Sequence, residues 1–187
     1  MYACGNIHEL THELQRYNWD IIGLSEVRWT GIGETITEEG QKIWFSGEEK
    51  KHHYGVAFIV RKESKPHNMT IIRVYAPTSD HDDDEVEELY KQLDALIARV
   101  LRKGILVVQG NWNAKVGPYS HQHWAGTFCR FGIGETNNKD LRFLEFAKNH
   151  RLTLANSLHP HKLSRTATWH SSNGRVHNQL DFDSKPA

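Results

Sequence analysis

The sequence predicts a layered α/β domain. Segments with helical periodicity alternate with β-branched and aromatic segments, the chain ends in strand-forming residues, and 38% of the residues are apolar, which is enough for a packed core. A length of 187 residues fits one domain. Since no repeat, low-complexity tract or linker interrupts the pattern, we expect a single domain over residues 1–187.

The first half of the chain predicts one helix and three strands. Apolar residues recur at three- and four-residue steps over 7–17, which marks one face of a helix, and 20–25 follows as a short strand. The segments 55–60 and 69–75 are the clearest strands because they are rich in β-branched residues and bounded by Gly and Pro. Pro77 ends the second of them.

An acidic run then marks the start of a second helix. Seven of the nine residues over 80–88 are acidic, Thr78, Ser79 and Asp80 are good N-caps, and the helix macrodipole favours negative charge at this end. Arg-Lys-Gly at 102–104 suits its end. A metal-binding acidic loop is the alternative, but no Gly-containing calcium-loop spacing accompanies the acids. One apolar stripe follows the acids: Val86, Leu89, Tyr90, Leu93, Leu96, Ile97 and Val100.

The second half continues the alternation. A nearly continuous apolar run at 105–110 predicts a strand buried on both faces. A helix is expected over 141–150 and a strand over 152–155. A last strand pair is expected at 166–169 and 176–182, joined by a Ser-Ser-Asn-Gly turn.

The composition bears on the kind of partner and on the compartment of the protein. The formal charge is zero, but outside the acidic run the chain has 23 basic and 16 acidic side chains. This excess of positive charge is compatible with a polyanionic partner. Cys4 and Cys129 cannot build a disulfide framework, so a reducing compartment is favoured. Because no apolar run approaches the ~20 residues of a membrane span and no signal peptide is recognisable, we expect an intracellular protein of nucleus or cytoplasm, neither secreted nor membrane-bound.

Polar residues at the ends of predicted strands are the candidates for chemistry. They are Glu26, Tyr75, Asn111, Asn113 and Asp181. Strand ends are where α/β folds place their sites. Taken singly, each residue also has an ordinary structural explanation as a turn former, a cap or a packed edge aromatic.

Together these residues lie in four segments that match one superfamily. The segments GLSEVRW (23–29), VYAPTS (74–79), QGNWNAKVG (109–117) and NQLDF (178–182) come in the order found in endonuclease/exonuclease/phosphatase proteins. With RFGIGE at 130–135, the chain resembles the endonuclease domain of LINE-type (RTE or BovB-like) retrotransposons and the craniofacial development protein 2-like proteins derived from them. The resemblance covers nearly all of the chain. It implies a four-layer α-β-β-α sandwich.

The resemblance also implies roles. Members hydrolyse phosphodiesters with Mg²⁺, so Glu26 would be the metal ligand and Tyr75 would contact the scissile phosphate. Asn113 would hydrogen-bond a phosphate oxygen, and Asp181 would orient a catalytic His. DNA is the expected partner, a membrane and a small-molecule cofactor are not expected, and the oligomeric state is left open.

The chain departs from the family pattern at several points. Asn111 stands where the family has the Asp that positions or deprotonates the attacking water, and general base catalysis contributes typically ~10²–10⁴-fold. The family continues to a Ser-Asp-His motif, begins with a further strand and has a longer stretch near 61–68. We therefore expect an incomplete sandwich that lacks its first and last strands, with an internal deletion near 61–68 and a weak or lost Mg²⁺ site.

These departures leave three hypotheses. The first is a Mg²⁺-dependent DNA endonuclease of retrotransposon type with weak or no activity. The second is a non-catalytic domesticated or decaying fragment that binds nucleic acid or a protein at most. The third, a lipid or inositol phosphodiesterase, is disfavoured by the LINE-like context of 109–117.

Two surface features leave further alternatives. The pairs His121/His123 and His159/His161 could bind a soft metal, although exposed loop histidines are the more common case. Scattered basic residues are usually plain surface charge, yet six of them could contact phosphate: Lys103, Lys115, Arg130, Lys139, Arg142 and Arg165.

Overall fold

The computed structural model describes residues 4–50, 55–63, 68–78, 81–100, 104–136, 138–171, 173 and 175–186. The chain divides into two compact units, one of residues 1–67 with 73–75 and one of residues 68–72 with 76–187. Both mix helices and strands, so the predicted α/β class is confirmed. Among the described residues, no helix combines the length and the apolar character needed to cross a bilayer.

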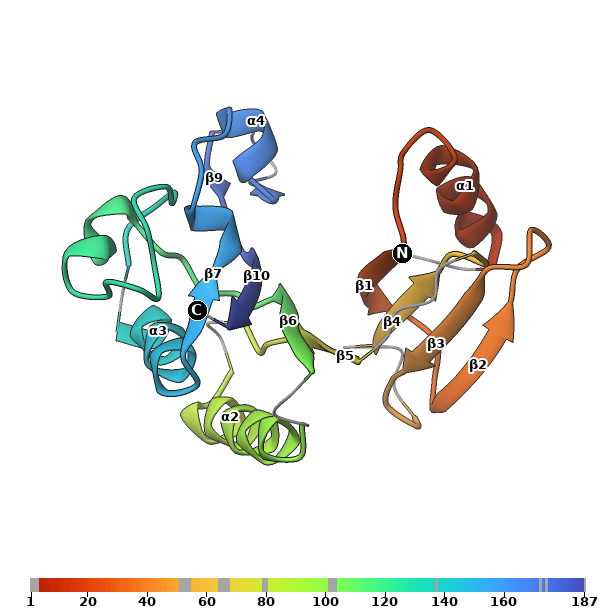
Figure 1. Cartoon of the computed structure of the whole chain (residues 1–187), viewed down its shortest axis with the longest axis horizontal. Coiled ribbons are helices and arrows are strands. Elements are labelled where there is room, and N and C mark those ends of the chain that lie inside the picture. Colours follow the sequence, from red (N-terminus) through yellow and green to blue (C-terminus); the bar gives the residue numbers. More distant parts are fainter. Residues whose placement is uncertain are drawn as a thin grey trace. The chain divides into compact units, whose positions relative to one another are not determined.

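The first unit contains helix α1 (Cys4–Leu14) and a four-stranded sheet (Figure 1). Its strands run in the order β1-β4-β3-β2, and each neighbouring pair is antiparallel. Ile7 of α1 packs with apolar residues of β1, β3 and β4 to form a small core. The strands are β1 (Ile21–Val27), β2 (Ile32–Ile36), β3 (Lys42–Ser46) and β4 (Gly55–Val60).

The second unit is built on a sheet in the order β5-β6-β10-β7. These strands are β5 (Met69–Tyr75), which passes into the first unit at Arg73, β6 (Ile105–Asn111), β7 (Leu152–Leu154) and β10 (Asp181–Pro186). Strand β10 pairs antiparallel with β6 and with β7. Helices α2 (Asp83–Ala98) and α3 (Asn138–Asn149) belong to the same unit.

Helices α2 and α3 are joined by polar contacts and share an aromatic cluster. Arg142 of α3 forms an ion pair with Glu87 of α2, and His150 Nε2 lies 2.6 Å from Asp94 Oδ1. Aromatic rings of α2 and α3 stack with Trp112 just beyond β6. This packing places the end of β6 against two helices.

Short elements complete the second unit. They are the 3-10 turns η1 (Pro118–Gln122) and η2 (Ala155–Ser157), the one-turn helix α4 (Leu163–Thr166), and the hairpin β8 (Trp169–His170) with β9 (His177–Asn178).

The structure corrects several predicted boundaries. The α2 helix begins at Asp83 after Asp82, which makes no side-chain capping bond, so Thr78 is not its cap; Ser79 and Asp80 lie outside the described residues. The helix ends at Ala98, before the segment 102–104 that was expected to close it; residues 102 and 103 lie outside the described residues.

The predicted last strand pair was also partly wrong. Only two residues of each arm pair with each other, Thr166 ends a helix, and 181–186 joins the larger sheet. The reason is tertiary, because β10 completes more ladder bonds between β6 and β7 than it could in a hairpin. Strands β2 and β3 were not predicted.

Candidate functional site

In the first unit, the structure brings Glu26 and Tyr75 together. The Tyr75 phenol donates a hydrogen bond to Glu26 Oε1 at 3.1 Å. Two residues earlier on β5, Arg73 Nη2 donates to Ser25 Oγ at 2.8 Å. Residues 73 and 75 lie on the same side of the strand, so β5 contacts two consecutive residues of β1. Arg73 was not among the predicted site residues, although its two-residue spacing from Tyr75 on a strand places both side chains on one face.

A β-bulge presents Glu26. The ladder between β1 and β4 shifts register between Ser25 and Val27, and Glu26 takes a left-handed backbone with φ 58°. Val27 is buried while Glu26 is exposed, so the extra residue turns the carboxylate outward. Gly55 sits opposite Val27, and a Cβ on it would lie only 2.0 Å from the Val27 carbonyl oxygen. The bulge therefore depends on glycine at position 55.

In the second unit, the turn after β6 positions two asparagines around a buried tryptophan. Trp112 is 3% exposed, and its ring stacks on Phe143 with centroids 4.3 Å apart. Its backbone N–H donates to the Leu180 carbonyl at 2.8 Å. Because this ring is anchored, the side chains on either side of it, Asn111 and Asn113, are held at fixed positions.

The two asparagines use opposite ends of their amides. Asn111 Oδ1 accepts the backbone N–H of Asn113 at 2.9 Å, whereas Asn113 Nδ2 donates to the Ala76 carbonyl at 2.6 Å. Asn113 has φ 47°, a conformation that asparagine tolerates better than most residues. The Ala76 N–H in turn donates to the Asn111 carbonyl at 2.8 Å, which closes the turn.

Asp181 lies across the ladder from Asn111. It is the first residue of β10, and the two residues are paired in the register of β10 and β6. Thr168 Oγ1 accepts the backbone N–H groups of Leu180 and Asp181 at 3.0 and 3.2 Å, which fixes the start of the strand. Asn111, Asn113 and Asp181 therefore form one group in the second unit, and Glu26 with Tyr75 forms one in the first.

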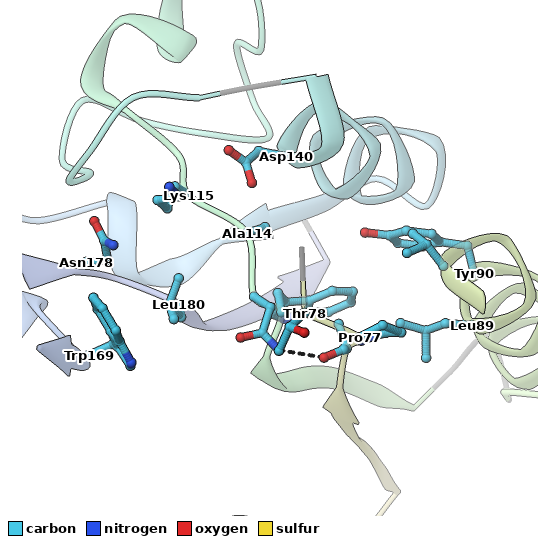
Figure 2. A pocket seen from close by; sticks show the side chains of 14 residues that line it. Pro77, Thr78, Leu89, Tyr90, Ala114, Lys115, Asp140, Trp169, Asn178 and Leu180 are labelled. Atoms are coloured by element: carbon cyan, nitrogen blue, oxygen red, sulfur yellow. Dashed lines mark hydrogen bonds between the residues drawn. The ribbon is translucent and has the colours of Figure 1, made fainter. Parts of the chain in front are cut away.

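A cavity of about 270 Å³ adjoins Asn113 (Figure 2). Polar and apolar side chains both line it. Lys115, Asn178 and Thr78 are polar, and the indole of Trp169 is partly exposed. The remaining lining residues are mainly apolar or aromatic: Ala76, Pro77, Val86, Leu89, Tyr90, Trp112, Ala114 and Leu180, with Asp140 as the acid.

Burial affects the ionisation of Tyr90, which lines this cavity. Desolvation raises the pKa of the Tyr90 phenol, and the Asp140 carboxylate raises it further. Asp140 itself is 3% exposed. Tyr90 is therefore a neutral hydroxyl in this cavity, which suits a hydrogen-bonding and packing role and excludes service as a base at neutral pH.

The fit to a divalent cation rests on one carboxylate. Glu26 is exposed, and its Oε1 accepts the bond from Tyr75 while Oε2 can serve a cation. In the described part of the chain, no three His, Cys, Asp or Glu side chains converge as a metal cluster. A hard cation such as Mg²⁺ does not require such a cluster, because it keeps several waters and binds through one or two carboxylates plus phosphate.

Comparison with known proteins identifies the relatives. The chain is 34% identical over 199 aligned residues to craniofacial development protein 2 of Bos taurus and 33% identical to that of Tragulus javanicus, with 95% of the chain covered in each. It spans about a third of the length of these curated relatives. No protein-family model matches the chain.

A solved structure shows the fold. An Asp-to-Asn variant of the 3′ phosphatase NExo from Neisseria, bound to a product DNA hairpin, superimposes with a TM-score of 0.61 over 97% of this chain and 81% of that chain, at 17% identity. At this identity, the likeness concerns the fold. The chain is therefore similar in sequence to about a third of craniofacial development protein 2, and similar in fold to the 3′ phosphatase NExo.

Proposed function

We propose that this chain is a DNA phosphodiesterase domain of the retrotransposon endonuclease type whose hydrolytic rate is weak or nil. The observation that carries the proposal is Asn111 in the turn after β6, at the position where the resemblance implies a catalytic Asp. The side-chain carbonyl oxygen of Asn111 already accepts the Asn113 N–H. An amide cannot take a proton from water, and general base catalysis accounts for typically ~10²–10⁴-fold of a rate.

The other predicted site residues support phosphate recognition. The Asn113 amide donates one N–H to Ala76, and its second N–H can donate to a phosphate oxygen. Lys115 lines the adjoining cavity and adds a positive charge. Asp181 keeps its proposed role as the residue that would orient a catalytic His.

Glu26 and a phosphate oxygen would be alternative acceptors for the hydroxyl hydrogen of Tyr75. The phenol has a single hydrogen, which it gives to Glu26. To donate to a phosphate oxygen the phenol must release Glu26 Oε1, and both carboxylate oxygens are then available to a cation. Mg²⁺ bound by Glu26 would neutralise charge developing on the phosphate.

Plasmid nicking tests the proposed activity. We expect purified protein to nick supercoiled plasmid in Mg²⁺ no faster than a Glu26→Ala control. Robust nicking that needs Mg²⁺ and is lost in that control would contradict the weak-turnover part of the proposal.

A second candidate function, a non-catalytic nucleic-acid binding module, is favoured by the same amide at position 111. A gel-shift titration with duplex and single-stranded DNA at rising salt tests it. Binding driven by phosphate contacts must weaken steeply, with a slope of about −0.9 in log K against log salt for each neutralised phosphate of duplex DNA. Salt-independent binding or no binding would exclude this candidate.

A further inference from the structure

Two histidines lie directly opposite each other in the hairpin of β8 and β9. His170 pairs with His177 in the antiparallel register, and Trp169 pairs with Asn178 one step along. The two imidazole rings have centroids 4.7 Å apart and planes at 82°. The ladder therefore holds the two rings together before any ligand binds.

Both imidazoles are available to a ligand. His170 is exposed and His177 is half-buried. Within the described residues, neither ring takes part in a hydrogen bond or an ion pair, and the two rings contact each other. Their ring nitrogens therefore face no competing protein partner in this part of the chain.

The spacing of the rings suits a shared transition-metal ion. A zinc–nitrogen bond is about 2.0–2.1 Å, and the ring centre lies roughly 1 Å beyond the nitrogen, so two imidazoles on one tetrahedral ion have centres about 5 Å apart. The observed 4.7 Å agrees with this value. We propose that His170 and His177 form a two-imidazole site for Zn²⁺ or a similar borderline metal.

The site would keep open coordination positions. No third His, Cys, Asp or Glu joins this pair among the residues that the structure describes, so water would complete the shell. Nitrogen ligands favour Zn²⁺ over Mg²⁺, which prefers oxygen. This site therefore differs from Glu26 in its metal, and it stands independently of the proposed hydrolysis.

Metal binding would act on the candidate site through the hairpin. Successive side chains of a strand point to opposite faces, so Trp169 and Asn178 face away from the histidines. Both line the cavity beside Asn113 (Figure 2). An ion that clamps His170 to His177 fixes the two strands and with them this wall of the cavity.

Calorimetric titration of the tag-free chain with ZnCl₂ tests the site. We expect saturable binding whose affinity falls at least tenfold in His170→Ala/His177→Ala, with MgCl₂ as the negative control. His8→Ala/His12→Ala is the matched control, because these exposed histidines lie one turn apart on α1 and form a second surface pair. It should leave the affinity within twofold. No binding by the unmodified chain, or loss only in the His8/His12 variant, would overturn the proposal.

Fluorescence separates clamping from mere binding. Zn²⁺ should change the tryptophan emission of the unmodified chain, since Trp169 neighbours His170 in β8. Trp169→Phe should bind Zn²⁺ with the same affinity but lose that change in emission. A response that persists in Trp169→Phe would refute the effect on the cavity wall.

Discussion

The Tyr75 phenol donates a hydrogen bond to Glu26, with 3.1 Å between the phenol oxygen and Oε1. The carboxylate that accepts it projects from a bulge, where the backbone is left-handed with φ 58°. This conformation is unfavourable for a residue with a Cβ, and such strain gathers at functional sites. The left-handed backbone at Glu26 therefore lowers the stability of the fold, and it also directs the carboxylate outward.

Glycine at position 26 should be more stable than alanine. Both Glu26→Gly and Glu26→Ala remove the bond from Tyr75, but only glycine adopts a positive φ without a steric penalty. We expect Glu26→Gly to exceed Glu26→Ala in free energy of unfolding by about 1 kcal/mol. Urea unfolding at pH 7 measures the difference.

Glu34 supplies the matched comparison for that pair. It is an exposed residue of β2 without a positive φ, and both replacements remove the same contacts with Lys42 and Trp44. Here glycine should be the less stable by about 0.5–1 kcal/mol, since it weakens a strand. The same ranking at both positions would argue against strain at Glu26.

The asparagines of the turn after β6 should respond oppositely to aspartate. Asn111→Asp keeps an oxygen for the Asn113 N–H, so its stability should stay within about 0.5 kcal/mol of the parent. Asn113→Asp places an oxygen against the Ala76 carbonyl that now receives an N–H, and it should lose about 1–3 kcal/mol. Urea unfolding of both variants at pH 7 checks this, and equal losses would contradict the assigned amide orientations.

The anchor of that turn is Trp112. Replacing it with alanine should lower the free energy of unfolding by about 3–5 kcal/mol, because the ring is 3% exposed and stacks on Phe143. Trp169→Ala is the control, since that indole is 44% exposed, and it should lose about 1 kcal/mol or less. Denaturant unfolding followed by circular dichroism measures both. Similar losses would mean that Trp112 is not the anchor.

The predicted elements with strong local signals are present in the structure. The segments 55–60 and 69–75 form strands β4 and β5 at the predicted bounds, because β-branched composition and flanking Gly and Pro act within each segment. Strand β2 was missed because its support is cross-strand: Glu34 reaches Lys42 at 3.0 Å and Trp44 Nε1 at 2.9 Å. A residue pattern alone does not reveal such partners.

For the candidate site residues, too, the sequence predicted what depends on local signals and missed what depends on contacts between distant segments. Their positions at strand ends could be read from the motifs, as for Asn111 at the end of β6 and Asp181 at the start of β10. The left-handed backbone of Glu26 and the bond from Asn113 to the Ala76 carbonyl could not, because both depend on a register and a turn between distant segments. The catalytic and metal-binding roles stay predictions.

Tyr90 should make the protein sensitive to alkali. Burial and the Asp140 carboxylate raise the pKa of its phenol in the folded state, while the unfolded chain ionises near the ordinary value of about 10. The unfolded state therefore holds fewer protons above pH ~10, and stability falls as the pH rises. Below that pH the contribution is complete. Tyr90→Phe should show a shallower loss between about pH 9.5 and 11 in urea unfolding, whereas Tyr119→Phe, whose ring is 80% exposed, should follow the parent. Parallel pH profiles for the parent and Tyr90→Phe would show that the Tyr90 phenol ionises alike in both states.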